Sequence, residues 1–298
     1  MKRNTSFYAA ALILAIGSFY CCGGKAGETE TATPDFNSVT TPREAADTSE
    51  TGEPRGESEA GDEKTAVKGA STSGVERLKA AYPQKIKDIR DNTIFFTDGT
   101  TMVYDDGKKK DFVTMLDYSD PEDMFLEAYE DMSNPPAYLH DVGRSRSEEL
   151  FKKLYGNSKA AVEKQLTYVD WFGGRVRFSS SNDAAKQLEK VQKELAQHPE
   201  LKKYLKNSGT FYWRKVRGAN RLSAHSYGIA IDIGEGYNDY WLWSNKGAGE
   251  LKKISYKNRM PMEIVEIFEK YGFIWGGRWY HYDTMHFEYR PELNPPKK

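Results

Sequence analysis

Cysteine is scarce in this chain, and no charge of either sign is in excess. The 298 residues include only two cysteines, Cys21 and Cys22, which are adjacent and near the N-terminus. The rest of the chain therefore has no disulfide and no thiol chemistry. Acidic and basic residues nearly cancel, which gives a formal net charge of -1. Because nucleic-acid binding needs a basic face, the composition predicts no nucleic-acid partner.

The apolar segment nearest the N-terminus is too short to cross a membrane as a helix. It runs from Phe7 to Phe19 and follows the positively charged Lys2 and Arg3. A membrane-spanning helix needs about 20 apolar residues. A charged start followed by a short apolar core is typical of an export signal, which we expect over residues 1–22.

The two cysteines directly follow this apolar core. This arrangement is typical of bacterial lipoproteins, in which a cysteine thiol receives a diacylglycerol and becomes the first residue. Cys22 is the better lipidation site, because the small Cys21 precedes it, whereas the bulky Tyr20 precedes Cys21. Ordinary secretion with incidental cysteines is the alternative. The predicted location is the cell envelope, with a lipid anchor in the membrane and the protein facing the periplasm or the exterior.

Residues 23–72 contain little that could build a core. Between residues 23 and 70, Phe36 is the only aromatic residue, and 11 acidic residues stand against 5 basic ones. Such a segment cannot bury enough apolar area to offset its chain entropy. We therefore expect a disordered acidic tether that holds a folded domain away from the membrane.

Ordered structure is expected from about residue 73, with helices and strands mixed without a regular βαβ alternation. This indicates an α+β fold, an antiparallel sheet with flanking helices. The expected helices are residues 75–82, 120–132, 145–156, 181–197 and 260–272. The expected strands lie within residues 92–107, 210–218, 229–233 and 273–290. Residues 73–180 are predicted to form an N-terminal α+β region of unknown role, and residues 181–298 the functional domain.

One predicted strand carries a carboxylate. In "RLSAHSYGIAIDIG", which runs from Arg221 to Gly234, alternate isoleucines face one way, while Ala230 and Asp232 face the other. An unpaired buried carboxylate is costly, so a metal ion or a hydrogen-bond network must satisfy Asp232. His225 precedes this strand and could share in either arrangement.

A second stretch, "YHYDTMHFEYR", supplies the missing partners. A catalytic zinc site uses three nitrogen or oxygen ligands and leaves one open position for water. His225, Asp232 and His286 complete such a set. Asp283 is then left nearby as a general base, and zinc lowers the pKa of its water to about 7. Glu288 lies on the same side of the strand as His286 and would orient it.

The same residues allow a simpler interpretation. The two histidines could be core residues that bond to Asp232 and Asp283 in a buried polar cluster without a metal. The spacing alone leaves both interpretations open.

The two stretches together resemble a known family. "RLSAHSYGIAIDI" is similar to the Ser-x-His-x-x-Gly-x-Ala-x-Asp signature of VanY-type zinc D-alanyl-D-alanine carboxypeptidases and their L-alanyl-D-glutamate endopeptidase relatives. "GFIWGGRWYHYDTMHFEY" is similar to that family's second signature, with its Gly-Gly turn, acidic residue and closing His-Phe-Glu. The resemblance covers about residues 211–292 and extends toward the helix at 182–196. It implies a hedgehog/DD-peptidase fold.

Carried over by position, the resemblance implies a Zn2+ ion held by His225, Asp232 and His286. It implies Asp283 as the base that activates water and later protonates the leaving amine. In this family an arginine before the first motif steadies the substrate carbonyl or the oxyanion. Arg214 is our choice for this role, and Arg217 and Arg221 are the alternatives.

The implied function is hydrolysis of peptidoglycan stem peptides. Many carboxypeptidase and dipeptidase members have Glu at the position of Asp283, whereas Asp is typical of the endopeptidase branch. The sequence therefore leaves two candidates for the bond that is cut, D-Ala-D-Ala and L-Ala-D-Glu. The alternative function is that of a non-catalytic, envelope-anchored peptidoglycan-binding lipoprotein that retains the zinc site.

Overall fold

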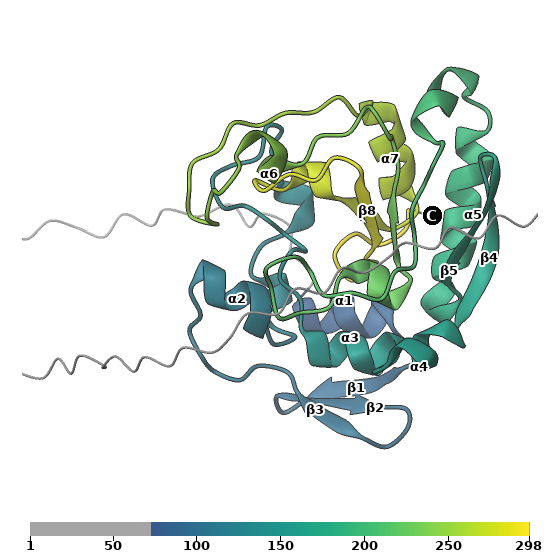
Figure 1. Ribbon diagram of the computed structural model, residues 1–298. Helices are drawn as coiled ribbons and strands as arrows, with labels where there is room; N and C mark the ends of the chain where they lie inside the picture. The colour runs from purple at the N-terminus through teal and green to yellow at the C-terminus, as the bar shows by residue number, and fades with distance from the viewer. Residues whose placement is uncertain (1–72, 298) are drawn as a thin grey trace, which may run out of the picture. The chain divides into compact units, whose positions relative to one another are not determined.

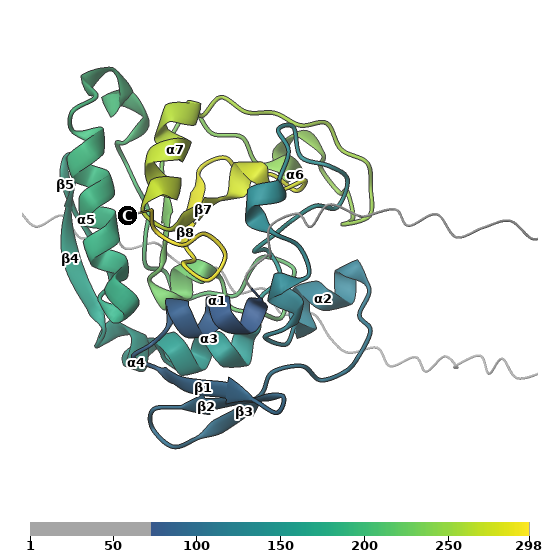
Figure 2. The same ribbon diagram turned by 180° about the vertical axis from the view of Figure 1, so that it is seen from behind.

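A computed structural model describes residues 73–297 (Figures 1 and 2). The predicted signal peptide, the tether over residues 23–72 and the lipidation candidate Cys22 lie outside the described residues. All described residues fall within one compact unit. Within the described part of the chain, no helix is both long enough and apolar enough to cross a membrane.

The described residues form short helices and short strands. The helices are α1 (Gly74–Ala81), α2 (Phe112–Tyr118), α3 (Glu148–Tyr155), α4 (Lys159–Glu163), α5 (Ala184–Leu195), α6 (Trp241–Ser244) and α7 (Met262–Lys270). The strands are β1 (Ile86–Arg90), β2 (Thr93–Phe96), β3 (Thr101–Val103), β4 (Leu166–Trp171), β5 (Gly174–Ser179), β6 (Ala230–Asp232), β7 (Phe273–Trp275) and β8 (His286–Tyr289). The 3-10 turns are η1 (Asp123–Phe125), η2 (Tyr129–Asp131), η3 (Ser181–Asp183), η4 (Pro199–Tyr204), η5 (Ala224–Tyr227) and η6 (Gly276–Arg278).

The strands pair into three small antiparallel sheets. Their strand orders are β1-β2-β3, β4-β5 and β6-β8-β7. Figures 1 and 2 show α5 lying along the β4–β5 hairpin, and α7 beside the sheet that contains β8. The α+β class predicted from the sequence is confirmed. The third sheet is the one that positions the candidate site.

Local signals explain where several helices begin. Ser73 caps α1 in a capping box, in which its hydroxyl accepts from the backbone N–H of Glu76 and the Glu76 carboxylate accepts from the N–H of Ser73. Ser147 caps α3 in the same position, accepting from the backbone N–H of Leu150. Pro261 directly precedes α7, where its missing N–H costs nothing. The helices predicted at these places are confirmed.

The helix predicted over residues 120–132 is wrong. The structure has two 3-10 turns there, η1 and η2. The Asp120 carboxylate accepts the backbone N–H groups of Glu122 and Asp123, and the Asp123 carboxylate accepts the N–H of Asp120. These local bonds offer the backbone an alternative to the helical ladder.

The strand predicted over residues 210–218 forms only as isolated bridges. Gly209 pairs with Asp232, and Lys215 pairs with Leu222. Between them, the Ser226 hydroxyl accepts the backbone N–H of Arg214 and donates to its carbonyl oxygen. The Ser226 side chain thus bonds to the backbone N–H and carbonyl of Arg214, as a paired strand would do in a regular sheet.

The larger of two hydrophobic clusters joins the two halves of the described chain. Leu78 of α1 and Phe151 of α3 belong to the same cluster of buried residues as Leu188 of α5, Phe268 of α7 and Phe287 of β8. Residues 73–180 therefore contribute directly to the core that supports the candidate site.

Candidate functional site

Two strands and one turn bring His225, Asp232 and His286 together. His225 lies in η5, and Asp232 is the last residue of β6. Gly228 reverses the chain between them with φ +67°, and a Cβ there would lie 2.4 Å from Leu166 Cδ2. His286 begins β8 and stands opposite Asp232 in the antiparallel register. Sheet register and a glycine turn thus place all three side chains.

The three side chains turn one atom each toward a common point. The distance from His225 Nε2 to His286 Nδ1 is 3.3 Å, and from His225 Nε2 to Asp232 Oδ1 it is 3.2 Å. His286 Nδ1 lies 2.9 Å from Asp232 Oδ1. These residues form a group that could hold a metal ion.

Two sides of the triangle, 3.2 Å and 3.3 Å, match zinc coordination, and the third, 2.9 Å, is shorter. Zn–N and Zn–O distances near 2.0–2.1 Å in a tetrahedron place neighbouring ligand atoms about 3.3 Å apart. The donor set of two imidazoles and a carboxylate is also one that zinc accepts.

Hydrogen bonds on the far side of each histidine fix which nitrogen faces the group. His225 Nδ1 lies 2.6 Å from the carbonyl oxygen of Thr210, which can only accept, so Nδ1 carries the proton. His286 Nε2 lies 3.0 Å from Glu288 Oε1. This leaves His225 Nε2 and His286 Nδ1 as the ligand atoms. The structure places Glu288 where the strand alternation predicts it.

Charges within the group shift two pKa values strongly. Burial raises the pKa of the Asp232 carboxyl, but His225 and then His286 outweigh it and hold the pKa well below its usual range. Burial lowers the pKa of His286, but hydrogen bonds with Asp232 and Glu288 outweigh it and raise the pKa to about 10. The proton held between His286 and Asp232 is the one that a divalent cation would replace.

Asp283 lies at the wall of the same cavity but outside the group of ligand atoms. Its Oδ1 is shielded from solvent and has no hydrogen-bond partner among the described residues. Burial, and secondly the charge of Asp232, raise the pKa of Asp283 to about 7. A carboxyl group with such a pKa can take up and release a proton near neutrality.

The three ligand candidates and Asp283 line a cavity of about 510 Å³. Aromatic side chains and arginines form much of its wall. The lining includes Arg144, Arg146, Arg214, Arg217, Arg221, Ser223, Tyr240, Trp241, Trp243, Trp279, His281, Asp283 and Glu288. The walls thus combine apolar surface with an unusual number of guanidinium groups.

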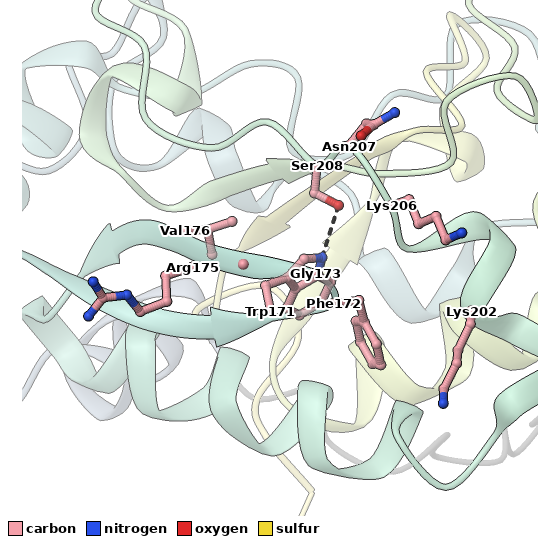
Figure 3. Close-up of a pocket in the computed structure, with 10 residues that line it drawn as sticks. Trp171, Phe172, Gly173, Arg175, Val176, Lys202, Lys206, Asn207 and Ser208 are labelled. Carbon is pink, nitrogen blue, oxygen red and sulfur yellow. Dashed lines mark hydrogen bonds between the residues drawn. The ribbon is translucent and has the colours of Figure 1, made fainter. Parts of the chain in front are cut away.

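A second cavity of similar size, about 550 Å³, lies at the turn of the β4–β5 hairpin (Figure 3). Trp171, Phe172, Arg175, Lys202 and Lys206 line it, and the Trp171 indole donates to the Ser208 hydroxyl. Its wall contains no histidine or carboxylate. It therefore lacks the histidines and carboxylates that could ligate a metal ion, which the first cavity has.

All three arginines considered from the sequence line the first cavity, but their settings differ. Arg214 and Arg217 are exposed, whereas Arg221 is buried and donates from Nη1 to Asp117 Oδ1 at 2.7 Å. Sequence reasoning missed Arg144 and Arg146. They precede α3, and no local pattern distinguishes them from surface charges, because only the fold brings them to the cavity.

Comparison with known proteins bears on this site directly. Residues 217–289 match the D-alanyl-D-alanine carboxypeptidase family model. The resemblance read from the two motifs is thereby confirmed. The match spans His225, Asp232, Asp283 and His286, and begins well after the segment that carries Arg146. No curated protein and no solved structure matches the chain. The family match supports a peptidase.

Proposed function

We propose that the protein is a zinc-dependent peptidase that hydrolyses peptidoglycan stem peptides, at either the D-Ala-D-Ala or the L-Ala-D-Glu bond. The observation that carries the proposal is the triangle of His225 Nε2, Asp232 Oδ1 and His286 Nδ1, with sides of 2.9–3.3 Å. The family match over residues 217–289 supports the peptidase class. The proposal includes a hedgehog/DD-peptidase fold for the domain.

The residues of the site divide the chemistry between them. His225 and His286 present lone pairs, and Asp232 adds a negative charge, so this set would hold Zn2+. When bound, zinc supplies a Lewis acid and a water of lowered pKa. Thr210 and Glu288 keep the two imidazoles in the required tautomers.

Asp283 carries the proton in this proposal. It removes a proton from the attacking water as the water oxygen bonds to the scissile carbonyl carbon. It then delivers that proton to the departing nitrogen as the C–N bond breaks, which yields a carboxylic acid and an amine; at neutral pH the acid gives up its proton and the amine takes one up. Arg214 lies at the cavity and has fixed, always charged donors, so it would stabilise the negative charge that develops on the carbonyl oxygen.

We also propose that the protein works from a lipid anchor at Cys22 in the cell envelope, where peptidoglycan lies. The predicted signal over residues 1–22 and the acidic tether over residues 23–72 support this placement. Radiolabelled palmitate should enter the full-length protein in a bacterial host. A Cys22→Ala variant should lose the label, and label retained through Cys21 would move the anchor by one residue.

A muropeptide digest tests the enzymatic proposal. The full-length protein is incubated with purified muropeptides, with and without a chelator, and products are identified by mass spectrometry. We expect a chelator-sensitive product that has lost a terminal alanine or has been cut between alanine and glutamate. Bound zinc and wall binding without any product would instead favour the non-catalytic binding lipoprotein.

A further inference from the structure

Two buried arginines line the candidate active-site cavity outside the residues that the proposed mechanism uses. Arg146 is 5% exposed and Arg221 is 6% exposed. Both line the cavity that contains His225, Asp232 and His286. Arginine is rarely buried without a charged partner, so each needs an explanation.

Backbone and carboxylate contacts hold both guanidinium groups in place. Arg146 Nη2 donates to the carbonyl oxygen of Leu222 at 2.5 Å, and Arg221 Nη1 donates to Asp117 Oδ1 at 2.7 Å. The backbone N–H of Leu222 in turn donates to Glu148 Oε2 at 2.7 Å. Because Leu222 follows Arg221 directly, the Arg146 guanidinium is held at the backbone next to Arg221.

The partners present do not use all the donors. Arg221 Nε is buried and has no hydrogen-bond partner among residues 73–297. Glu288 lies 3.6 Å from Arg146 Nη1, but it already accepts from His286 and Arg290. A buried donor without an acceptor is costly, and one that belongs to a charged group more so. An anion entering from the cavity would supply the missing acceptor.

The positive charges near Arg221 also favour an anion in the cavity. Burial lowers the pKa of Arg221, and the charges of Arg146 and Arg144 lower it further. Asp117 opposes this shift but does not cancel it. Arg144 itself is already paired with Asp141 and Glu250, with contacts of 2.8 Å and 2.9 Å. Among the buried arginines, Arg221 pairs with Asp117, and Arg146 lies 3.6 Å from Glu288, a carboxylate that it shares with His286 and Arg290.

We propose that Arg146 and Arg221 bind a carboxylate of the peptide substrate and so select peptides that carry a free carboxylate near the scissile bond. This inference rests on the proposed peptidase function. The planar guanidinium fork matches a carboxylate, and charge-assisted bonds are the strongest kind of hydrogen bond. The carboxylate has two sources in a stem peptide: the C-terminus, or the α-carboxylate of the γ-linked glutamate.

Binding to an inactive variant tests this separately from catalysis. An Asp283→Asn variant of the full-length, zinc-loaded protein is titrated calorimetrically with the synthetic peptide L-Ala-γ-D-Glu-L-Lys-D-Ala-D-Ala. Two relatives of this peptide are titrated as well, one with a C-terminal carboxamide and one with a carboxamide at the glutamate α-position. We expect one carboxamide to weaken binding by about tenfold or more, because a hydrogen bond to a charged group is lost. The carboxamide that does so identifies the source.

Substitutions then assign the effect to the arginines. Arg221→Gln and Arg146→Gln, each in the Asp283→Asn background, should bind the carboxylate and carboxamide peptides almost equally. Arg175→Gln removes the same charge at the second cavity (Figure 3) and should preserve the preference. Arg221→Lys keeps the charge without the fork and should retain only part of the preference.

The possible outcomes are distinct. Equal binding of all three peptides to the protein with both arginines intact would overturn the inference, even if the substituted proteins fail to fold. A carboxylate preference that survives both Gln substitutions would also overturn it. If the wild-type protein cuts nothing but the arginine-dependent preference is present, the proposed hydrolysis fails while the carboxylate site stands.

Discussion

His286 stands directly opposite Asp232 in the antiparallel pair of β8 and β6, and its Nδ1 lies 2.9 Å from Asp232 Oδ1. Side chains alternate between the two faces of a strand. A slip of one residue in this register would therefore turn one of the two groups away from the other. The candidate metal site thus depends on strand pairing as much as on the identity of the ligands.

Removing the proposed base should separate metal binding from hydrolysis. Asp283→Asn preserves the size of the side chain but cannot accept a proton at neutral pH. Because Asp283 lies outside the group of ligand atoms, the variant should keep about the zinc content of the parent protein. Loss of a general base typically lowers kcat by about 10² to 10⁴. Metal analysis and muropeptide turnover check the two parts, and full activity would remove Asp283 from the mechanism.

Loss of a ligand should abolish the stabilisation that zinc provides. A ligand present at about 1,000 times its Kd stabilises the folded state by about 4 kcal/mol. For a domain of this size each kcal/mol raises Tm by roughly 2–4 °C. The zinc-loaded parent should therefore melt well above the chelated protein, whereas His225→Gln should show little difference between the two conditions. An equal zinc-dependent shift in His225→Gln would show that the ion binds elsewhere.

A buried ion pair links the two ends of the described chain. Arg290 and Glu292 are both fully buried and bonded to each other, and the Tyr82 hydroxyl donates to Glu292 Oε2 at 2.7 Å. Glu292→Gln leaves the Arg290 charge without its main partner, which typically costs about 3–5 kcal/mol. Urea denaturation should show a loss of this size.

An exposed pair provides the control for this measurement. Glu130 pairs with Arg77, but its side chain is 56% exposed. Glu130→Gln should therefore change the free energy of unfolding by less than about 1 kcal/mol. Similar losses in the two variants would mean that the pair of Arg290 and Glu292 contributes no more than a surface contact.

Much of the candidate site could be predicted from the sequence because its residues lie in two short segments. Alternation along one strand marked Asp232, and the spacing in "DTMHFE" marked His286 and Glu288 together. Each prediction needed only the geometry of a single strand. The structure adds the close approach of the three ligand atoms, which depends on the pairing of β6 with β8.

The arginines of residues 141–146 could not be predicted in this way. Arg144 and Arg146 are far from the two motifs in the chain, and only the tertiary fold, in which nearby Val142 shares a cluster with Ile274 and Trp279, brings their segment to the cavity. The failed helix over residues 120–132 has a related cause. Several of its residues, such as Met124, Leu126 and Glu127, favour a helix, but the Asp120 and Asp123 carboxylates bond to nearby backbone N–H groups instead.

Asp141 holds the segment that carries Asp283. Its Oδ1 accepts the backbone N–H of His281 at 3.0 Å, and its Oδ2 lies 2.6 Å from His281 Nδ1 and 2.8 Å from Arg144 Nη1. Burial raises the pKa of the Asp141 carboxyl, but Arg144 and His281 outweigh burial and hold the pKa below its usual value. Asp141 therefore stabilises the folded state in its ionised form.

Because the pKa of Asp141 is lowered in the folded protein, its contribution to the free energy of unfolding falls as the pH falls. The stabilisation by Asp141 is complete above the pKa of the unfolded carboxyl, about 3.9. It is lost as the pH falls through the lower pKa of the folded protein. Asp141→Asn should therefore be less stable than the parent at pH 7. The difference should shrink below about pH 4, by at most about 1.4 kcal/mol per pH unit.

Urea unfolding between pH 7 and pH 3 measures this difference, and a neighbouring substitution separates it from simple loss of packing. Val142→Ala leaves a small cavity at a buried position without removing a carboxylate. The free energy of unfolding of Val142→Ala should lie below that of the parent by the same amount at every pH. For Asp141→Asn the difference from the parent should shrink as the pH falls. If the difference in the free energy of unfolding from the parent were independent of pH for both variants, Asp141 would act through packing alone. Its ionised carboxylate would then not be what holds His281.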